Sequence, residues 1–281
     1  MTVLLSVLIS LVSLFALYML LLMTRAKRKA AAAFMRSPYA HRGLWSKKLA
    51  ENSLSAFRAA VEAGVGIELD VQLSSDGEVV VFHDDHLGRM TGENARVREK
   101  TAEELASLSL AQTKEGIPTL REVLALVDGK VPLLVELKSE YQRNLLCEKT
   151  AAILDEYKGP YMIESFHPLI VGWFRRHRPK IVRGQLHSWV FDKKNGRSAP
   201  TLILSLLLLN LFARPDFMAY DIQHASCLPL RLALLWRPYR VAWTARKRED
   251  LLIASRADTV IFESVEDDLL VSLRTEKGEN V

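Results

Sequence analysis

Two carboxylates lie two positions apart in the apolar run IELDVQL, at Glu68 and Asp70. Side chains two positions apart on a strand point to the same face of the sheet, so both carboxylates face the same way. Like charges held side by side repel each other, and such a pair persists where a cation joins them. Oxygen-only ligands favour a hard cation such as Mg²⁺ or Ca²⁺. The pair therefore predicts a divalent metal site.

A third carboxylate, Glu136, ends another apolar run, VPLLVELK, and Lys138 shares its face. Charged residues at strand ends are placed where α/β enzymes build their sites. Each carboxylate alone is better explained as a solvated strand end or a salt bridge than as a metal ligand. Together, Glu68, Asp70 and Glu136 favour a shared metal ion.

Two histidines stand at the ends of neighbouring runs. His41 is followed by Arg42 and Gly43, and His83 ends the hairpin that starts near Glu68. Cleavage of a phosphodiester needs a base for the nucleophile and an acid for the leaving alkoxide, and histidine serves both near neutral pH. Arg42 can hold phosphate oxygens with two hydrogen bonds, and Gly43 lets the backbone approach a ligand closely.

The elements that must position these side chains are short apolar runs alternating with helical patterns. Such alternation is typical of a parallel α/β sheet. Eight runs are expected to be strands: those starting at Tyr39, Ile67, Val131, Tyr161, Lys180, Phe217, Arg240 and Thr259. EVVVFHD should pair with IELDVQL as a hairpin, because Asp76 and Gly77 between them signal a tight turn.

Three of the intervening segments carry helix signals. SLSAFRAAVEAG has apolar residues at helical spacing and ends in Gly64. TAEELASLSL and TLREVLALVDG each begin with a threonine ahead of acidic residues, which predicts N-caps at Thr101 and Thr119.

The first 36 residues differ from the rest. Residues 2–23 carry no charge, and about 20 apolar residues suffice to cross a bilayer, so residues 1–24 are predicted to be a transmembrane anchor rather than a cleaved signal peptide. Residues 25–36 form a basic juxtamembrane linker, containing Arg25, Lys27, Arg28, Lys29 and Arg36. By the positive-inside tendency, the following domain should be cytoplasmic.

The 245 residues from 37 to 281 are close to the roughly 250 of a βα barrel and predict one domain. The formal charge of +5 is matched by the five basic residues beside the anchor, so charge favours anionic lipid and gives no support for nucleic-acid binding. Cys147 and Cys227 show no metal-ligand spacing and are expected to be free thiols.

Residues 201–213, TLILSLLLLNLFA, are nearly all apolar. One helix of this length would be about 20 Å long, too short to span a bilayer easily. It is either an outer helix packed in the core or an interfacial segment, to which residues 228–239 would add Trp236 and Tyr239.

Several of these motifs occur together in one family. The order and spacing of HRG at 41–43, EN at 51–52, ELD at 68–70, FHD at 82–84 and VELK at 135–138 resemble the glycerophosphodiester phosphodiesterase family. Further matches run through LGRMTG, IPTLREVL, SFHP at 165–168 and AWT at 242–244. The resemblance covers essentially the whole chain after the anchor.

The resemblance implies a TIM (β/α)8 barrel, one divalent cation, and hydrolysis of glycerophosphodiesters to sn-glycerol 3-phosphate and an alcohol. It suggests acid–base roles for His41 and His83. The other roles carried over are metal ligation by Glu68, Asp70 and Glu136, phosphate contacts from Arg42 and Lys138, support of the site by Glu51, and a pocket wall from Trp243. In the family the substrate's own 2-hydroxyl is thought to be the first nucleophile, giving a cyclic phosphate that water opens.

Departures from the family's pattern concern the rim of the site. Ala50 stands where the family usually has proline, and VIFESVE replaces the usual acidic-residue-then-proline ending, so that Glu263 takes the place of an aspartate and is given no role. The alternatives are cleavage of membrane lysophospholipids by the same residues, favoured by the anchor and Trp189, and a catalytically silent membrane scaffold. The oligomeric state is not predicted.

Overall fold

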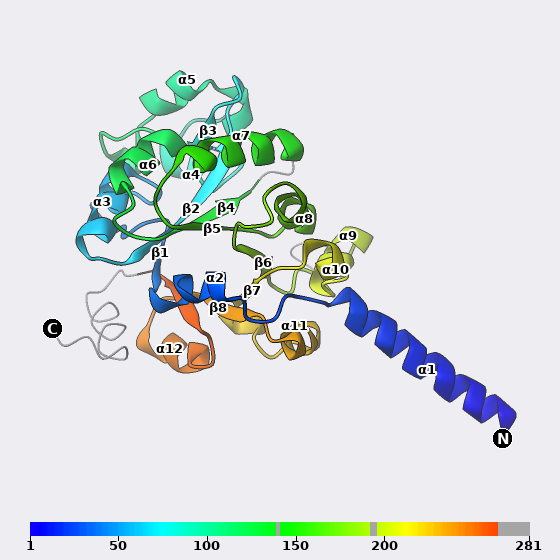
Figure 1. Ribbon diagram of the computed structural model, residues 1–281. Helices are drawn as coiled ribbons and strands as arrows, with labels where there is room; N and C mark the ends of the chain where they lie inside the picture. The colour runs from blue at the N-terminus through cyan, green and yellow to red at the C-terminus, as the bar shows by residue number, and fades with distance from the viewer. Residues whose placement is uncertain (139–140, 192–195, 264–281) are drawn as a thin grey trace.

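The computed structural model describes residues 1–138, 141–191 and 196–263. Its centre is a closed barrel of parallel strands surrounded by helices (Figure 1). β1 pairs with both β2 and β9, which closes the ring, while β3 pairs antiparallel with β2 as a hairpin. The strands are β1 (Tyr39–His41), β2 (Gly66–Leu73), β3 (Val79–Val81), β4 (Leu133–Leu137), β5 (Tyr161–Ser165), β6 (Arg183–His187), β7 (Phe217–Asp221), β8 (Tyr239–Ala245) and β9 (Thr259–Phe262). The predicted TIM barrel and its eight parallel strands are confirmed.

The helices of the outer ring follow the strands in chain order. Ser53 caps α3 by accepting a hydrogen bond from the Ala56 N–H, and Thr101 and Thr119 form the predicted capping boxes of α5 and α6. The ring helices are α3 (Leu54–Glu62), α6 (Leu120–Val127), α7 (Arg143–Glu156), α8 (Pro168–His177), α9 (Ala199–Ser205), α10 (Asn210–Ala213), α11 (Leu228–Ala233) and α12 (Arg248–Ala254). Between β3 and α6 an inserted segment carries α4 (Gly88–Thr91), η2 (Val97–Glu99), α5 (Ala102–Ser107) and η3 (Leu110–Gln112); η4 (Ile222–His224) and η5 (Leu234–Trp236) flank α11.

The inside of the barrel changes character along its axis. Outward-facing residues such as Leu69 and Val135 belong to the large cluster between the strands and helices. An inner cluster contains Leu134, Met162 and Phe217. The inward-facing positions nearer the carboxyl ends of β2 and β4 carry carboxylates instead. The apolar part therefore stabilises the barrel, and the acidic part is left for chemistry.

The basic segment expected to be a linker packs beneath the barrel. It contains α2 (Lys29–Ala32) and η1 (Phe34–Arg36), and Ala31 and Met35 are buried in the inner cluster. The Tyr39 hydroxyl donates to the Phe34 carbonyl at 2.9 Å. Lys27 pairs with Asp258 and Arg28 with Asp216. Part of the basic charge is thus used inside the fold rather than presented to a membrane.

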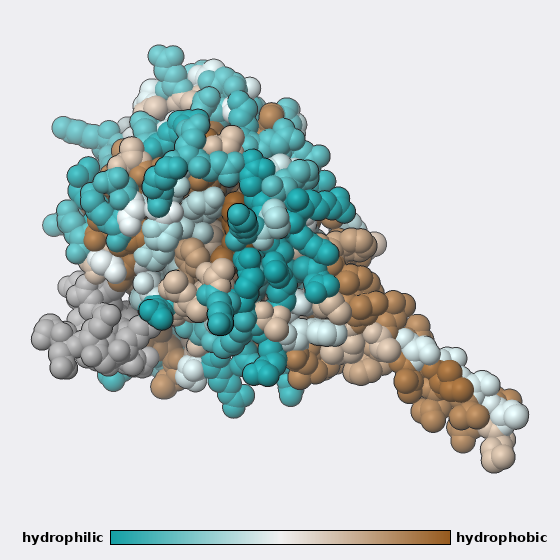
Figure 2. Space-filling model, in the orientation of Figure 1, coloured by the Kyte–Doolittle hydropathy of each residue, from teal (hydrophilic) through white to brown (hydrophobic). Residues whose placement is uncertain are grey.

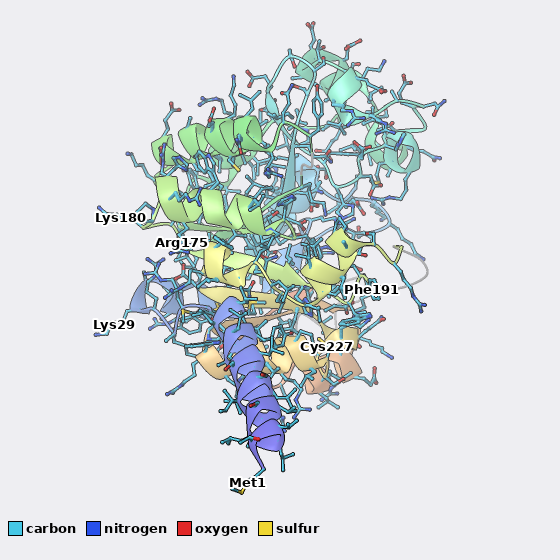
Figure 3. All side chains as sticks on the ribbon, turned by 90° about the vertical axis from the view of Figure 1, so that its right-hand side faces the viewer. Met1, Lys29, Arg175, Lys180, Phe191 and Cys227 are labelled. Carbon is cyan, nitrogen blue, oxygen red and sulfur yellow. The ribbon has the colours of Figure 1, made fainter. Side chains whose placement is uncertain are left out.

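Helix α1 (Thr2–Leu21) is apolar enough to cross a membrane, and none of its residues is buried. It leaves the ring of helices sideways, near α10 and α11, and brown apolar side chains cover it and the surface at its root (Figures 1 and 2). Its last turn is held by the barrel: Trp236 Nε1 donates to the Met19 carbonyl at 3.0 Å and the Tyr18 hydroxyl to Leu206 O at 3.2 Å. Figure 3 shows Lys29 at one end of the barrel, Phe191 at the other, and α1 leaving between them.

Residues 201–213 do not form the single helix expected from their composition. α9 ends at Ser205, Leu207 has a positive φ of 56°, and α10 starts at Asn210. Leu207 is buried, whereas Leu202 and Phe212 are the large apolar residues of this stretch that stay exposed. The Ser205 hydroxyl accepts hydrogen bonds from the N–H groups of Val190 and Phe191. These bonds tie the end of α9 to the segment that follows β6. The prediction of one 13-residue helix was wrong, because a left-handed backbone conformation at Leu207 cannot continue an α-helix.

Candidate active site

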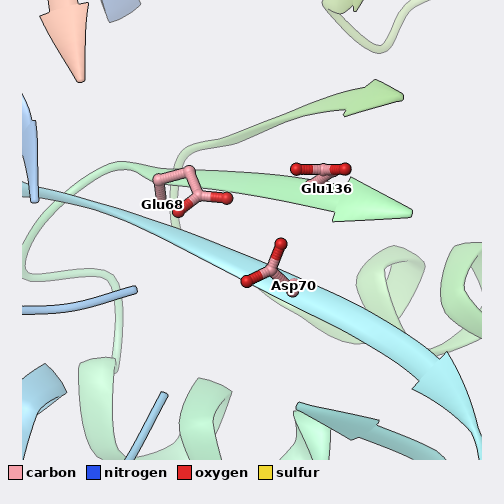
Figure 4. A group of neighbouring side chains, drawn as sticks. All are labelled: Glu68, Asp70 and Glu136. Atoms are coloured by element: carbon pink, nitrogen blue, oxygen red, sulfur yellow. The ribbon is translucent and has the colours of Figure 1, made fainter. Parts of the chain in front are cut away.

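Three buried carboxylates meet at the carboxyl ends of β2 and β4 (Figure 4). The parallel register places Asp70 directly beside Glu136, and His41 of β1 beside Glu68. Each of the three carboxylates offers an oxygen, and these atoms lie within 4.8 Å of one another. Two neighbouring strands, β2 and β4, thus form one acidic cluster, and β1 adds His41 at its edge.

The charges of this cluster are not balanced evenly. Burial and the neighbouring carboxylates raise the pKa of Glu68 well above its usual value. Burial likewise raises the pKa of Glu136 to about 7, although Lys138 opposes the shift. For Asp70 burial is outweighed by the positive charges of Lys138, His83 and Arg42, which hold its pKa well below the usual range.

A divalent cation fits this donor set. Repulsion among the three carboxylates would be relieved by a positive charge between them. Among the described residues, Asp70 Oδ1 has no hydrogen-bond partner, although Lys138 Nζ lies 3.5 Å away. Buried carboxylate oxygens without donors are the ligands that hard cations bind.

Two cations border the carboxylates. Lys138 Nζ lies 3.0 Å from Glu136 Oε1. Arg42 Nη1 donates to Glu51 Oε1 at 2.8 Å, and its Nε lies 3.5 Å from Asp70 Oδ2. The backbone N–H of Arg42 also donates to Glu68 Oε2 at 2.9 Å. Glu51 is itself held by Arg89 at 2.6 Å, so the carboxylate that supports the Arg42 guanidinium is fixed in place.

The two histidines are oriented in the same way. His41 Nδ1 lies 2.6 Å from Glu263 Oε1, and His83 Nδ1 lies 2.6 Å from Asp84 Oδ1. A carboxylate only accepts, so each contact places a proton on Nδ1. Nε2 is left as the nitrogen that could accept or donate a proton in both rings; for His41 it is 3.9 Å from Glu68 Oε2. Burial lowers the pKa of both histidines.

Three residues of this region received no role from sequence. Asn52 Nδ2 donates to Asp70 Oδ2 at 2.9 Å; it belongs to the EN pair, which was the available signal. Glu164 is buried beside Glu136, and burial and Glu136 raise its pKa well above the usual value. A lone glutamate in the apolar run YMIESF was its only signal. Glu263, set aside as a loop variant, holds His41; hydrogen bonds from His41 and Arg246 overcome the effect of burial and lower its pKa to about 2.

The remaining predicted residues are placed as follows. Trp243 of β8 packs edge-on against Phe166, with ring centroids 5.8 Å apart. Gly43 has φ of 80°, and a Cβ there would lie 3.0 Å from Ala56 and Phe57 of α3. Position 43 therefore requires glycine, because a side chain would be strained at this φ and would crowd α3. Both cysteines are free, as expected.

Comparison with known proteins identifies one family. The model of the glycerophosphoryl diester phosphodiesterase family matches residues 41–211. A glycerophosphodiester phosphodiesterase of Caldanaerobacter subterraneus is 44% identical over 108 residues, which are 36% of this chain and 44% of that protein. One of Bacillus altitudinis is 35% identical over 155 residues, which are 51% of this chain and 63% of that protein. The chain spans less than two thirds of the length of each of these relatives.

Solved structures share the barrel. A phosphodiesterase of Oleispira antarctica, solved in complex with the product sn-glycerol-3-phosphate, matches with a TM-score of 0.71 at 24% identity, covering 87% of this chain and 99% of that chain. A glycerophosphodiester phosphodiesterase of Thermotoga maritima matches with a TM-score of 0.64 at 28% identity, covering 84% of this chain and 97% of that chain. The first likeness shows a common fold that extends beyond the segment matched by the family model.

Proposed function

Because the chain belongs to the glycerophosphoryl diester phosphodiesterase family, we propose that it hydrolyses glycerophosphodiesters to sn-glycerol 3-phosphate and an alcohol. The observation that carries the proposal is the acidic cluster of Glu68, Asp70 and Glu136 with two oriented histidines at its edge. A silent scaffold would not need buried like charges at this cost in stability.

We assign the acidic cluster to one divalent cation, Mg²⁺ or Ca²⁺, held by Glu68, Asp70 and Glu136. When bound, the cation would supply Lewis acidity and offset the charge that develops on the phosphate. The raised pKa values of Glu68 and Glu136 support this assignment, because carboxylates that repel each other bind a cation readily.

His41 and His83 handle the two protons of the reaction. One Nε2 takes the proton of the attacking hydroxyl, and the other gives a proton to the leaving alkoxide oxygen. Glu263 and Asp84 hold the rings so that Nε2 points to the substrate. Family resemblance suggests that the substrate's 2-hydroxyl attacks first, which removes the need for a serine or cysteine nucleophile.

Binding of the substrate is assigned to residues around this centre. Arg42 and Lys138 hold phosphate oxygens, and Glu51 keeps the Arg42 guanidinium in place. Trp243 lines the pocket; among the described residues its buried Nε1 has no hydrogen-bond partner, so it is available to a substrate hydroxyl. These contacts orient the diester for attack.

The test is hydrolysis of glycerophosphocholine, glycerophosphoethanolamine and glycerophosphoglycerol by the full chain in detergent, with Mg²⁺, Ca²⁺ or EDTA. We expect turnover with metal and its loss in EDTA or in Glu68→Ala, Asp70→Ala and Glu136→Ala. His41→Ala and His83→Ala should each lower kcat by roughly 10² to 10⁴. Full turnover in excess EDTA would show that the reaction needs no divalent metal. A normal kcat in both histidine variants would show that the acid–base assignment is wrong.

A second candidate is lysophospholipase D-type cleavage of membrane lysophospholipids by the same residues. The observation that favours it is α1, which brings the barrel to a bilayer if it spans one. Lysophosphatidylcholine in vesicles distinguishes the two: release of choline from it at a rate comparable to that from glycerophosphocholine supports the lipid substrate, and release from glycerophosphocholine alone argues against it.

We propose a single-pass membrane protein with a cytoplasmic barrel. The support is the apolar α1 followed by Arg25, Lys27 and Arg28. Protease added to intact cells or spheroplasts should leave the barrel uncut, and digestion there would reverse the orientation.

A further inference from the structure

A polar pocket of about 330 Å³ opens beside the candidate active site. It begins at His83 and Lys138 and extends to Arg96, Arg98 and Tyr141. The pocket therefore joins two residues of the proposed reaction centre to two arginines of the segment inserted after β3. Any substrate with its phosphate at Lys138 has one of its two halves next to this opening.

The inserted segment holds the arginines on a firm backbone. Val97, between them, is buried in the cluster beneath the insertion. Its N–H donates to the Asp85 carbonyl at 3.1 Å, and the Arg96 N–H donates to Glu99 Oε2 at 2.9 Å. A ligand that meets these arginines meets groups whose backbone is already ordered, which lowers the entropy lost on binding.

The charges of the pocket do not cancel. Lys138 is paired with Glu136, and Arg96 Nη1 lies 3.0 Å from Asp85 Oδ2. Arg98 lies over the ring of Tyr141, 5.0 Å from its centroid, and within the described part of the chain it makes no ion pair with a carboxylate. Its positive charge is thus directed into a pocket whose other cations are neutralised. A guanidinium that lies over an aromatic ring can still donate its N–H groups to an anion, because these groups lie in the plane of the guanidinium.

We propose that this pocket binds the alcohol half of the diester and selects alcohols that carry an anionic group, a phosphate or a carboxylate, through Arg98. The inference rests on the proposed phosphodiesterase function. On the other side of the barrel mouth, the Trp243 and Phe166 rings offer an uncharged wall that suits glycerol. Substrates with a cationic head group, such as choline, place a positive charge near Arg98 and are disfavoured.

The experiment uses two substrates that differ by one phosphate: glycerophosphoinositol and glycerophosphoinositol 4-phosphate. For the full chain in detergent with its activating divalent metal at low salt, we expect kcat/KM to be at least roughly tenfold higher for the phosphorylated substrate. Arg98→Gln should bring the ratio close to one while leaving kcat/KM for glycerophosphoinositol within about twofold. Arg98→Lys should keep part of the preference, and the preference should fall as salt rises.

Arg58→Gln is the matched control, because Arg58 is an exposed arginine on α3 away from the pocket, and it should keep the wild-type ratio. A wild-type ratio of one or less, or a ratio unchanged in Arg98→Gln, overturns the selectivity while leaving the phosphodiesterase function standing. If the chain hydrolyses neither of these two substrates and none of the glycerophosphodiesters named above, both the selectivity and the phosphodiesterase function are overturned.

Discussion

At the scale of single residues, the two histidines proposed to transfer protons are each held by a neighbouring carboxylate. Glu263 and Asp84 each occupy Nδ1 of one histidine and leave Nε2 for the proposed proton transfer. The arrangement follows the logic of a catalytic base oriented by a third group. It makes the orienting carboxylates testable separately from the histidines.

Glu263→Ala removes the partner of His41 Nδ1, and the ring loses its fixed tautomer and direction. We expect kcat to fall at least roughly tenfold with little change in KM, because substrate contacts remain. Glu263→Gln, which keeps an acceptor oxygen, should retain more activity than the alanine variant. Steady-state kinetics of the full chain measure both effects.

Arg246→Gln serves as the control for Glu263. Arg246 Nε donates to Glu263 Oε2 at 2.8 Å, and its loss leaves the bond to His41 intact. We expect near-normal kcat in this variant. A normal kcat in Glu263→Ala as well would show that His41 needs no orienting carboxylate.

His187 predicts a loss of stability in acid. It is 2% exposed, bonded to Cys227, and burial and the nearby charge of His224 lower its pKa from 6.5 to about 4, with Asp221 opposing. Below pH 6.5 the unfolded chain therefore takes up a proton that the folded chain does not. Between pH 7 and pH 5 this group alone should lower the free energy of unfolding by about 2 kcal/mol.

Urea unfolding of the full chain in mild detergent at the two pH values measures this effect. His187→Gln cannot titrate, so its free energy of unfolding should change by about 2 kcal/mol less between the two pH values, whatever its absolute stability. An equal pH dependence in wild type and variant would contradict the assignment.

At the scale of elements, the parallel register of the strands builds the candidate site. Elsewhere in the barrel, one buried aspartate joins the segment after α1 to the strands. Asp216, directly before β7, is fully buried and meets three arginines: Arg25 at 3.5 Å, Arg28 at 3.0 Å and Arg183 at 3.9 Å. It therefore links the segment after α1 to the barrel wall.

Asp216→Asn should destabilise the chain by roughly 3–5 kcal/mol, because it leaves the buried guanidinium of Arg183 without its counter-ion. Asp155→Asn is the matched control: Asp155 pairs with Arg178 at 2.7 Å, but both are well exposed, so the loss should stay below about 1 kcal/mol. Urea unfolding compares the two variants. Equal losses would show that the buried ion cluster contributes no more than a surface pair.

At the scale of the whole molecule, the direction of α1 sets which flank of the barrel would face a bilayer that this helix crossed. It leaves the ring near α10 and α11, sideways to the barrel axis (Figures 1 and 3). If α1 crosses a bilayer, the flank at its root lies at the headgroups and the mouth of the barrel opens along the membrane surface. Exposed Leu235 lies on this flank, next to Trp236, whose indole donates to Met19 of α1.

We therefore predict that position 235 lies at the bilayer surface, whereas position 58 on α3, on the side of the ring away from α1, does not (Figure 1). The test is the full chain with Leu235→Cys or Arg58→Cys, labelled with a fluorophore and reconstituted with brominated lipid. Bromine should quench the label at 235 more strongly than that at 58, because quenching needs close approach to the acyl chains. Labelled wild type corrects for Cys227, and equal quenching at both sites would exclude this orientation.

The segment before Ser37 is needed by the barrel, as a chain that starts at Ser37 makes clear. Such a chain lacks Ala31 and Met35, which are buried under the barrel, and it loses the Arg28–Asp216 pair. Removing buried apolar groups and one partner of a buried ion pair destabilises a protein. Residues 25–36 are in this sense part of the folded domain.

The sequence by itself determined the features that depend on local patterns. Eight apolar runs alternating with helical patterns predicted the strands, threonine caps predicted α5 and α6, and the Asp-Gly turn predicted the β2–β3 hairpin. The two-residue period of a strand was enough to place Glu68 and Asp70 on one face. Motif order was enough to indicate the family and the candidate residues.

Only the tertiary structure decided which distant residues contact each of these side chains. Contacts between positions far apart, such as His41 with Glu263, or Asp216 with Arg28, leave no periodic signal in the sequence. The same holds for residues 201–213, whose uniform leucines do not specify a face, so the break at buried Leu207 could not be predicted from them. Local patterns specify secondary structure, but partners depend on barrel closure, which brings distant residues together.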